Sequence, residues 1–354
     1  MNRLRFGLLT TVAFQMLVVG QVAAQDGPQF EVDSSWPRPL PEGWIHGQLG
    51  GNCVDSHDHI AVVDRRNITE EETQTSRAAP PIQLFDTEGN LVGAFGDPQV
   101  VPMSIHGCVF DLDNNIYVAG NADGIIQKYS HEGELLLQIG SKGAFDSSTG
   151  LIDGAPQNSS PAQLFRPSDI AVDPDNGDIY ISDGYGNRRV AVFNKEGEFL
   201  RQWGRQASVE ESRAGVGGAF ARVVHCITMS NAGLLYVCDR QGDRVQVFDK
   251  QGNFIRNIWV KTGTPDVPDP RGTVWTVDFS PDEEQQYLYA MNGFKEVVHV
   301  LDHQSGEVLS GFGRPGHYAG DFTHGHTIAV DSMGNIYVAE TATGRRVQRF
   351  VPVQ

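Results

Sequence analysis

Short apolar runs alternate with tight polar turns along almost the whole chain. Residues 322–341 show the pattern: two β-rich runs, 327–330 and 336–339, flank a turn at 331–335 that contains Asp, Gly and Asn. Runs of this length and composition around such a turn are typical of a β-hairpin. The segment therefore predicts two paired strands, with His326 at the start of the first.

The same unit recurs with a period of roughly 50–60 residues, which is a signature of repeat architectures. Six hairpins are predicted at 51–64, 106–119, 168–183, 225–239, roughly 274–292 and 326–340. Each is followed by a second hairpin, at 82–96, 126–140, 190–204, 245–259 and 298–313, and a sixth begins at 347–350 and stops. Six units of four short strands predict an all-β, six-bladed β-propeller.

The sixth unit lacks its last strand, and residues 30–36 after the apolar leader can supply it and close the ring. A sandwich or a two-domain protein would not explain the repeat. The longer segments rich in Gly, Pro, Ser and acidic residues are expected to be loops at one rim of the propeller; they lie at 67–81, 141–163, 207–219 and 261–271.

Residues 1–24 are predicted to be a signal peptide. Arg3 and Arg5 precede a mostly apolar stretch at 6–19, and Val-Ala-Ala at 22–24 is a small-residue cleavage site. The alternative is a membrane anchor, but the apolar stretch is short for a spanning helix. We therefore expect export to the periplasm or the extracellular medium, and a single propeller over residues 25–354.

The formal net charge of −17 becomes more negative when the leader and its two arginines are removed. Such a charge disfavours nucleic acid and anionic membrane surfaces as partners. We expect a small-molecule or peptide substrate, no nucleic acid and no membrane after signal cleavage, whereas the oligomeric state stays open.

The four cysteines form no CxxC motif, and export would permit disulfides. Cys226 and Cys238 fall on two predicted paired strands and could face each other as a disulfide, or both could be free buried thiols. A bond between Cys53 and Cys108 has less support in the sequence.

Three histidines occupy one position of the repeat. When the hairpins are aligned on their second strands, His106, His225 and His326 each lie nine residues upstream, at the start of the innermost strand. Innermost strands line the channel of a propeller, so these side chains should converge there. Three neutral imidazoles with an open fourth position describe a catalytic zinc site. The remaining histidines are assigned to turns, loops or outer strands, without a ligand role: His46, His57, His59, His131, His299, His303 and His317.

The motifs around these positions resemble those of the peptidyl-α-hydroxyglycine α-amidating lyases, which are NHL-repeat six-bladed propellers. The resemblance spans nearly the whole mature chain. It is carried by His-Gly at 106–107, Ser-Asp-Gly-Tyr-x-Asn-x-Arg at 182–189, Val-x-His at 223–225 and Gly-His-x-Ile-Ala at 325–329.

This resemblance implies an exported zinc-dependent lyase that cleaves a carbinolamide-type C–N bond to an amide and glyoxylate. By resemblance His106, His225 and His326 hold the zinc, Tyr185 is the base and Arg65 is its partner. A free tyrosine has a pKa of about 10 and is a poor base at neutral pH. A guanidinium and a zinc ion nearby would both favour its phenolate form.

Two positions depart from the family pattern: His324 replaces a methionine, and Thr327 replaces an aspartate that helps to bind a structural calcium ion. Calcium is therefore doubtful, and His324 is a candidate second-shell group or substrate contact, because residues i and i+2 of a strand share a face. Two alternatives stay open. One is a propeller lactonase or hydrolase with a central metal, whose calcium site would need acidic ligands, and the other is a non-catalytic NHL binding platform.

Overall fold

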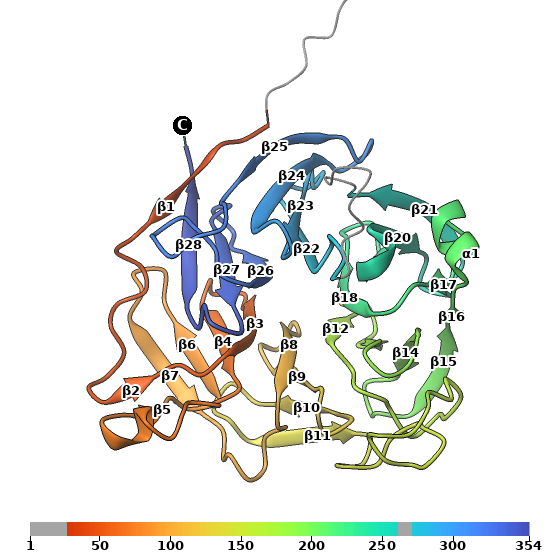
Figure 1. The fold of residues 1–354 in the computed structure, drawn as a ribbon, viewed down its shortest axis with the longest axis horizontal. Helices are drawn as coiled ribbons and strands as arrows, with labels where there is room; N and C mark the ends of the chain where they lie inside the picture. Colours follow the sequence, from red (N-terminus) through yellow and green to blue (C-terminus); the bar gives the residue numbers. More distant parts are fainter. Residues whose placement is uncertain (1–26, 261–270, 354) are drawn as a thin grey trace, which may run out of the picture.

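The structure is a computed structural model that describes residues 27–260 and 271–353. Its strands form six four-stranded antiparallel sheets, arranged as blades around a central channel (Figure 1). This confirms the all-β six-bladed propeller predicted from the repeat. The predicted signal peptide, and all but one residue of the loop at 261–271, lie outside the described residues.

We number the blades from 1 to 6 in chain order. Blade 1 consists of β3 (Leu49–Val54), β4 (Ile60–Asp64), β6 (Ile82–Phe85) and β7 (Leu91–Phe95). Blade 2 consists of β8 (Ile105–Phe110), β9 (Ile116–Gly120), β10 (Ile125–Tyr129) and β11 (Leu135–Ile139). Blade 3 consists of β12 (Asp169–Val172), β13 (Ile179–Asp183), β14 (Arg189–Phe193) and β15 (Phe199–Trp203).

The second half of the ring has the same plan. Blade 4 consists of β18 (Val224–Met229), β19 (Leu235–Asp239), β20 (Arg244–Phe248) and β21 (Phe254–Trp259). Blade 5 consists of β22 (Thr276–Phe279), β23 (Tyr287–Asn292), β24 (Val297–Asp302) and β25 (Val308–Phe312). Blade 6 consists of β26 (Gly325–Val330), β27 (Ile336–Glu340), β28 (Val347–Pro352) and β1 (Phe30–Asp33).

The ring closes between the first and last strands of the described chain. Strand β1 pairs antiparallel with β28, and the register runs from Phe30 opposite Pro352 to Asp33 opposite Arg349. Val32 packs beside Phe350 in an apolar cluster that blade 6 shares with blade 5. Closure of this kind removes the unpaired edge that β28 would otherwise expose.

The second strand of each blade lies between two neighbouring blades, which explains its composition. All five residues of β4 and all five of β9 are buried. A strand covered on both faces reads as a continuous apolar run instead of an alternating one. Burial of each Val or Ile contributes about 1.5–3 kcal/mol, so the core is distributed around the ring between blades.

Two disulfides are present, and none of the four cysteines is free. Cys53 and Cys108 join the innermost strands of blades 1 and 2, and Cys226 and Cys238 join β18 to β19 within blade 4. Disulfides of this kind persist in oxidising compartments outside the cytoplasm. They therefore suggest an extracytoplasmic protein.

Short additional elements occupy the predicted loops. The segment at 207–219 contains helix α1 (Val209–Ala214), which Ser208 and Glu211 begin with a capping box. The segment at 67–81 contains the 3₁₀ turn η1 (Glu72–Gln74). Two small parallel pairs complete the fold: β2 (Trp44–Ile45) with β5 (Arg77–Ala78), and β16 (Arg205–Gln206) with β17 (Ala219–Phe220). Across the described residues, no helix has the length and apolar character needed to cross a membrane.

Candidate metal centre

Each of the three predicted ligands is the second residue of an innermost strand, at a point where a β-bulge interrupts the pairing register. His106 lies in β8, His225 in β18 and His326 in β26. The register shifts fall at 105–108, 224–227 and 325–327. A bulge turns a side chain away from the regular alternation of the strand, and here each bulge coincides with a histidine.

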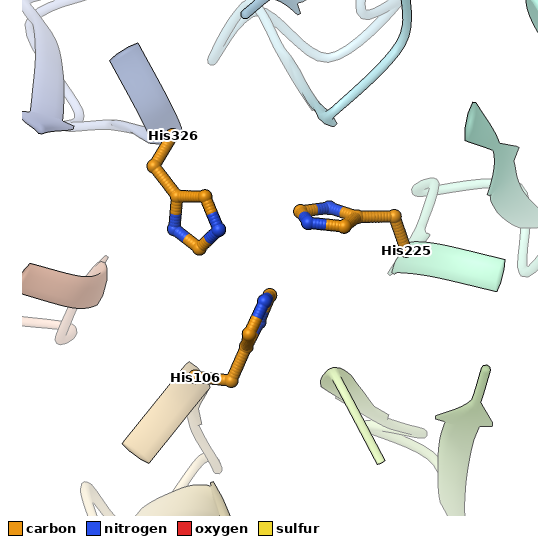
Figure 2. Close-up of side chains that lie close together, drawn as sticks. All are labelled: His106, His225 and His326. Atoms are coloured by element: carbon orange, nitrogen blue, oxygen red, sulfur yellow. The ribbon is translucent and has the colours of Figure 1, made fainter. Parts of the chain in front are cut away.

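The three imidazoles point to a common centre (Figure 2). Each ring offers one nitrogen, and the three nitrogens lie within 4.8 Å of one another. The ring centres of His106 and His326 are 4.6 Å apart, and those of His225 and His326 are 5.2 Å apart. All three residues are buried, with at most 3% of their surface exposed. The structure thus brings together the residues that the repeat alignment singled out.

A backbone carbonyl of the next blade orients each ring. The Nδ1 atoms of His106, His225 and His326 are hydrogen-bonded to the carbonyl oxygens of Ser168, Trp275 and Gly50, respectively. The distance is 2.8 Å for His106 and for His326. Because a carbonyl can only accept, each Nδ1 carries the proton and each Nε2 keeps its lone pair.

The roles therefore alternate around the ring: blades 2, 4 and 6 supply histidines, and blades 3, 5 and 1 supply the carbonyls. Burial lowers the pKa of all three imidazoles well below the usual range. The charge of Arg65 lowers the pKa of His326 further, and that of Arg240 lowers the pKa of His225. The rings are neutral at physiological pH, as metal ligation requires.

The hydroxyl of Tyr185 lies beside the same nitrogens. It is 3.2 Å from Nε2 of His106 and 3.0 Å from Nε2 of His225. A hydroxyl has one proton, so it can donate to only one of them. At least one of these two Nε2 atoms therefore receives no hydrogen bond from the hydroxyl. A metal ion at the centre would be ligated by the Nε2 lone pairs of all three histidines. The donor set, three Nε2 atoms with room for a further ligand, fits a divalent metal such as zinc.

The guanidinium bonded to Tyr185 belongs to Arg240, which the sequence analysis did not single out. Nη1 of Arg240 donates to the hydroxyl at 3.0 Å. Its guanidinium carbon lies 5.2 Å from the Tyr185 ring centre and 5.1 Å from that of Trp275. The repeat contained a usable signal: Arg240 directly follows Asp239, the last residue of a second strand, as Arg65 follows Asp64.

Arg65, the predicted partner of the tyrosine, also lies near the centre, but its hydrogen bonds go to other groups. Nε donates to the carbonyl of Ile105 at 3.0 Å, and Nη1 donates to Oγ1 of Thr341 at 3.1 Å. Burial lowers the pKa of Arg65, and the charge of Tyr185 acts in the opposite direction. Arg65 thus ties blades 1, 2 and 6 together beside the histidines.

The strand argument for His324 does not hold in the structure. His324 precedes β26 and has a left-handed backbone with φ of 63°. His324 and His326 are therefore not residues i and i+2 of one strand. The bulge at 325–327 also breaks the alternation of side chains between the two faces. Its amide donates to Glu296 at 3.0 Å, and its buried Nδ1 has no hydrogen-bond partner.

Thr327, at the position linked to calcium in the resembling family, bonds across the junction between blades 6 and 1. Its Oγ1 donates to Oδ1 of Asn52 at 2.7 Å. Nδ2 of Asn52 donates in turn to the carbonyl of Tyr337 at 2.9 Å. These neutral groups satisfy one another.

Comparison with known proteins agrees with the fold. Residues 166–193, in blade 3, match the model of the NHL repeat. The chain is 31% identical to peptidyl-glycine alpha-amidating monooxygenase B of Xenopus laevis over 91% of its length, and that alignment covers 35% of the relative. The chain thus spans about a third of the first curated relatives that it matches.

Relatives of similar length also match. A probable peptidyl-alpha-hydroxyglycine alpha-amidating lyase of Caenorhabditis elegans is 23% identical, over 84% of this chain and 81% of the relative. Human NHL repeat-containing protein 3 is 25% identical, over 92% of this chain and 84% of the relative. The solved streptogramin B lyase superposes with a TM-score of 0.55 at 13% identity, over 92% of this chain and 98% of that one. The last match concerns the fold alone.

The chain is an NHL-repeat six-bladed propeller with a buried histidine triad and with distant similarity, at 23–31% identity, to amidating lyase proteins and NHL repeat proteins.

Proposed function

We propose that this protein is a zinc-dependent lyase that cleaves the C–N bond of an α-hydroxyglycine-type carbinolamide, giving an amide and glyoxylate. One observation carries the proposal: a single tyrosine hydroxyl lies against two nitrogens of a buried three-histidine centre and against a guanidinium. A structural metal site would not need an ionisable hydroxyl at the metal. The distant lyase relatives support the same reaction class.

In this reaction Tyr185, as phenolate, accepts the proton of the substrate hydroxyl. The electrons of that O–H bond form the aldehyde carbonyl, and the electrons of the C–N bond pass to the nitrogen. The nitrogen then takes up one proton, which the tyrosine can return. No electrons are gained or lost overall, so the reaction needs no redox partner, and Tyr185 ends each cycle as it began.

The surrounding residues stabilise the charges that this step requires. Arg240 donates to the tyrosine oxygen, and a charge-assisted bond of this kind favours the phenolate. His106, His225 and His326 would hold the metal, with each ring fixed by a carbonyl. A bound zinc ion supplies Lewis acidity, which makes a nearby hydroxyl easier to deprotonate.

The test is a glyoxylate assay with an N-acyl-α-hydroxyglycine and the zinc-loaded mature protein. Wild type should release glyoxylate and the amide in equal amounts. Tyr185→Phe should lose about 100-fold or more of the rate, in the range of general acid–base catalysis, while metal analysis still finds zinc at the wild-type level. Tyr318→Phe, at an 80% exposed tyrosine, is the matched control and should retain full activity.

Three outcomes would count against the proposal. No glyoxylate from zinc-loaded wild type would exclude this substrate class. Unchanged turnover in Tyr185→Phe would exclude Tyr185 as the base. A zinc content of His225→Ala equal to that of wild type would exclude the ligand assignment.

A further inference from the structure

A second cluster of histidines lies at the other end of the channel from the triad. Strand β3 begins near Gly50, whose carbonyl bonds His326, and ends at Val54. The turn at 55–59 follows, so it lies about 17 Å further along the strand direction. The cluster consists of Asp55, His57 and His59 from this turn and His131 from the turn between β10 and β11 of blade 2.

One oxygen of Asp55 is used by the turn itself, and the other faces the imidazoles. Oδ1 accepts the backbone amides of His57 and His59, both at 2.8 Å. Oδ2 lies 3.0 Å from Nδ1 of His59, 3.3 Å from Nε2 of His131 and 4.0 Å from Nδ1 of His57. Ligand atoms of Asp55, His57 and His59 all lie within 4.8 Å of one another.

The side chain of Asp55 is held in place although it is buried. Its Oδ1 atom is fixed by the two backbone amides of the turn, which leaves Oδ2 directed at the imidazoles. The imidazoles are more accessible, with 30% of the His59 side chain and 65% of the His57 side chain exposed.

The repeat shows that the turn itself does not require histidine. Blades 2 and 6 have the same turn, in which the amide of Asp111 or Asp331 donates to the carbonyl four residues later. The residue at that fourth position is Asn115 or Asn335, and its side-chain amide bonds the aspartate. His59 occupies this position in blade 1, where an asparagine would serve the turn equally well.

The contact of His131 in blade 2 with Asp55 in blade 1 has a counterpart elsewhere in the ring. Lys250, in the outer turn of blade 4, reaches back to Asp173 of blade 3 at 2.8 Å. His131 occupies the matching place in blade 2 and reaches back to Asp55 of blade 1. A simple ion pair needs only a lysine there. Three imidazoles, two from blade 1 and one from blade 2, thus surround one carboxylate, where blades 2 and 6 use asparagine and blade 4 uses lysine.

We propose that Asp55, His57, His59 and His131 bind a divalent transition-metal ion of the class that imidazole prefers, such as Zn²⁺. Asp55, His57 and His59 supply three ligands, and His131, whose Nε2 lies 3.3 Å from Oδ2 of Asp55, would complete a four-coordinate set for zinc. The ion links blades 1 and 2 at their turns, next to the Cys53–Cys108 disulfide that joins the same two blades. The site is separate from the triad and does not depend on the proposed activity.

Zinc stoichiometry of the chelator-treated, refilled mature protein tests the proposal. Wild type should bind two equivalents of Zn²⁺. His59→Asn combined with His131→Lys copies the residues of blades 2 and 4, so it should preserve the turn and lose one equivalent. His225→Ala should lose the other equivalent and keep the outer one. His317→Asn, at an exposed histidine outside both clusters, should keep both.

Binding of one equivalent by wild type, or equal binding by wild type and the folded double variant, would overturn the proposal. If the double variant does not fold, Co²⁺ binding to His225→Ala decides the matter with the native outer residues. Visible absorption bands of four-coordinate Co²⁺ would support the site, and their absence at saturating Co²⁺ would overturn it.

Discussion

At the scale of single residues, the three-histidine centre arises because three of the six blades have histidine at the same position of the repeat. The innermost strands of blades 2, 4 and 6 carry histidine there, and the adjoining blades present a carbonyl to each ring. Tyr185 and Arg240 both lie just after the second strand of their blade, in blades 3 and 4. A common backbone thus places different chemical groups at equivalent points around one centre.

The bond from Arg240 to Tyr185 leads to a prediction for the proposed lyase. Arg240→Met removes the only charged donor that is hydrogen-bonded to the hydroxyl among the described residues. A charged hydrogen bond contributes about 1.5–3 kcal/mol, so kcat should fall by roughly 10–150-fold.

Arg166→Met is the control for this experiment. The guanidinium of Arg166 also lies over the Tyr185 ring, at 5.6 Å, but its bonds go to Asn121. We expect a much smaller fall in kcat for Arg166→Met, and zinc content should be unchanged in both variants. Equal kcat values for Arg240→Met and wild type would contradict the assigned role.

At the scale of elements, the bulges of the innermost strands set the centre. Blade 1 has a bulge at the same place, between Leu49 and Gly51, and its middle residue is Gly50. A Cβ at Gly50 would lie 1.9 Å from the carbonyl oxygen of Ile105, which is backbone of blade 2. Blade 1 therefore cannot carry a fourth side chain there and contributes its carbonyl to His326 instead.

Gly50→Ala should consequently affect stability and metal binding together. The clash with backbone cannot be relieved by a rotamer change, so we expect a loss of about 1–3 kcal/mol or more in the free energy of unfolding. Displacement of the carbonyl that orients His326 should weaken zinc binding by about 10–100-fold. Denaturant unfolding and a zinc competition assay measure the two effects.

Gly93→Ala is the matched control in an outer strand. Its Cβ would meet only the flexible Leu84 side chain, at 3.1 Å. Zinc affinity should be unchanged in this variant. Wild-type zinc affinity in folded Gly50→Ala would show that the carbonyl does not fix the ring.

At the scale of the whole molecule, the ring encloses a cavity of about 260 Å³ lined by the innermost strands. Asp169 of blade 3 and Asp278 of blade 5 border it, and each accepts a backbone amide from the following blade, Ile227 and Val330. Burial raises the pKa of both carboxyls to about 7. Closure of the ring thus brings together two acids that prefer to be protonated.

This predicts a pH dependence of stability. The pKa of Asp169 is about 7 in the folded chain, against an ordinary value of 3.8 for an aspartate side chain. The folded state therefore binds more protons between these values, so stability should fall as pH rises from about 4 to about 7. A three-unit shift is worth about 4 kcal/mol at most, and a cavity that can hold water reduces this cost.

Asp169→Asn should therefore stabilise the protein by about 1–2 kcal/mol at pH 8, within the upper limit just given, and have less effect at pH 5. Denaturant unfolding at the two pH values measures the difference. Asp113→Asn, at a turn acid outside the channel, is the control and should show no such difference. A gain that is the same at both pH values would mean that Asp169 is already ionised in the folded protein.

Periodicity alone determined the fold and the positions of the three histidines. The apolar strands must be buried, and the turn residues fix where each strand ends, so the repeat specifies six blades and the missing strand that β1 supplies. The same period places His106, His225 and His326 at equivalent points. In a closed ring, equivalent positions of the blades face one centre. The convergence of the three histidines could therefore be predicted without knowledge of side-chain contacts.

Only the tertiary structure decided which groups meet between blades. Arg240, not Arg65, bonds Tyr185, because the direction of a long side chain depends on its neighbours in other blades. His131 meets Asp55 across 76 positions of the chain, and the assignment of His131 to a turn could not reveal this contact. His324 has a left-handed backbone, and a bulge interrupts the strand that follows it. Period-two alternation in the sequence reveals neither feature.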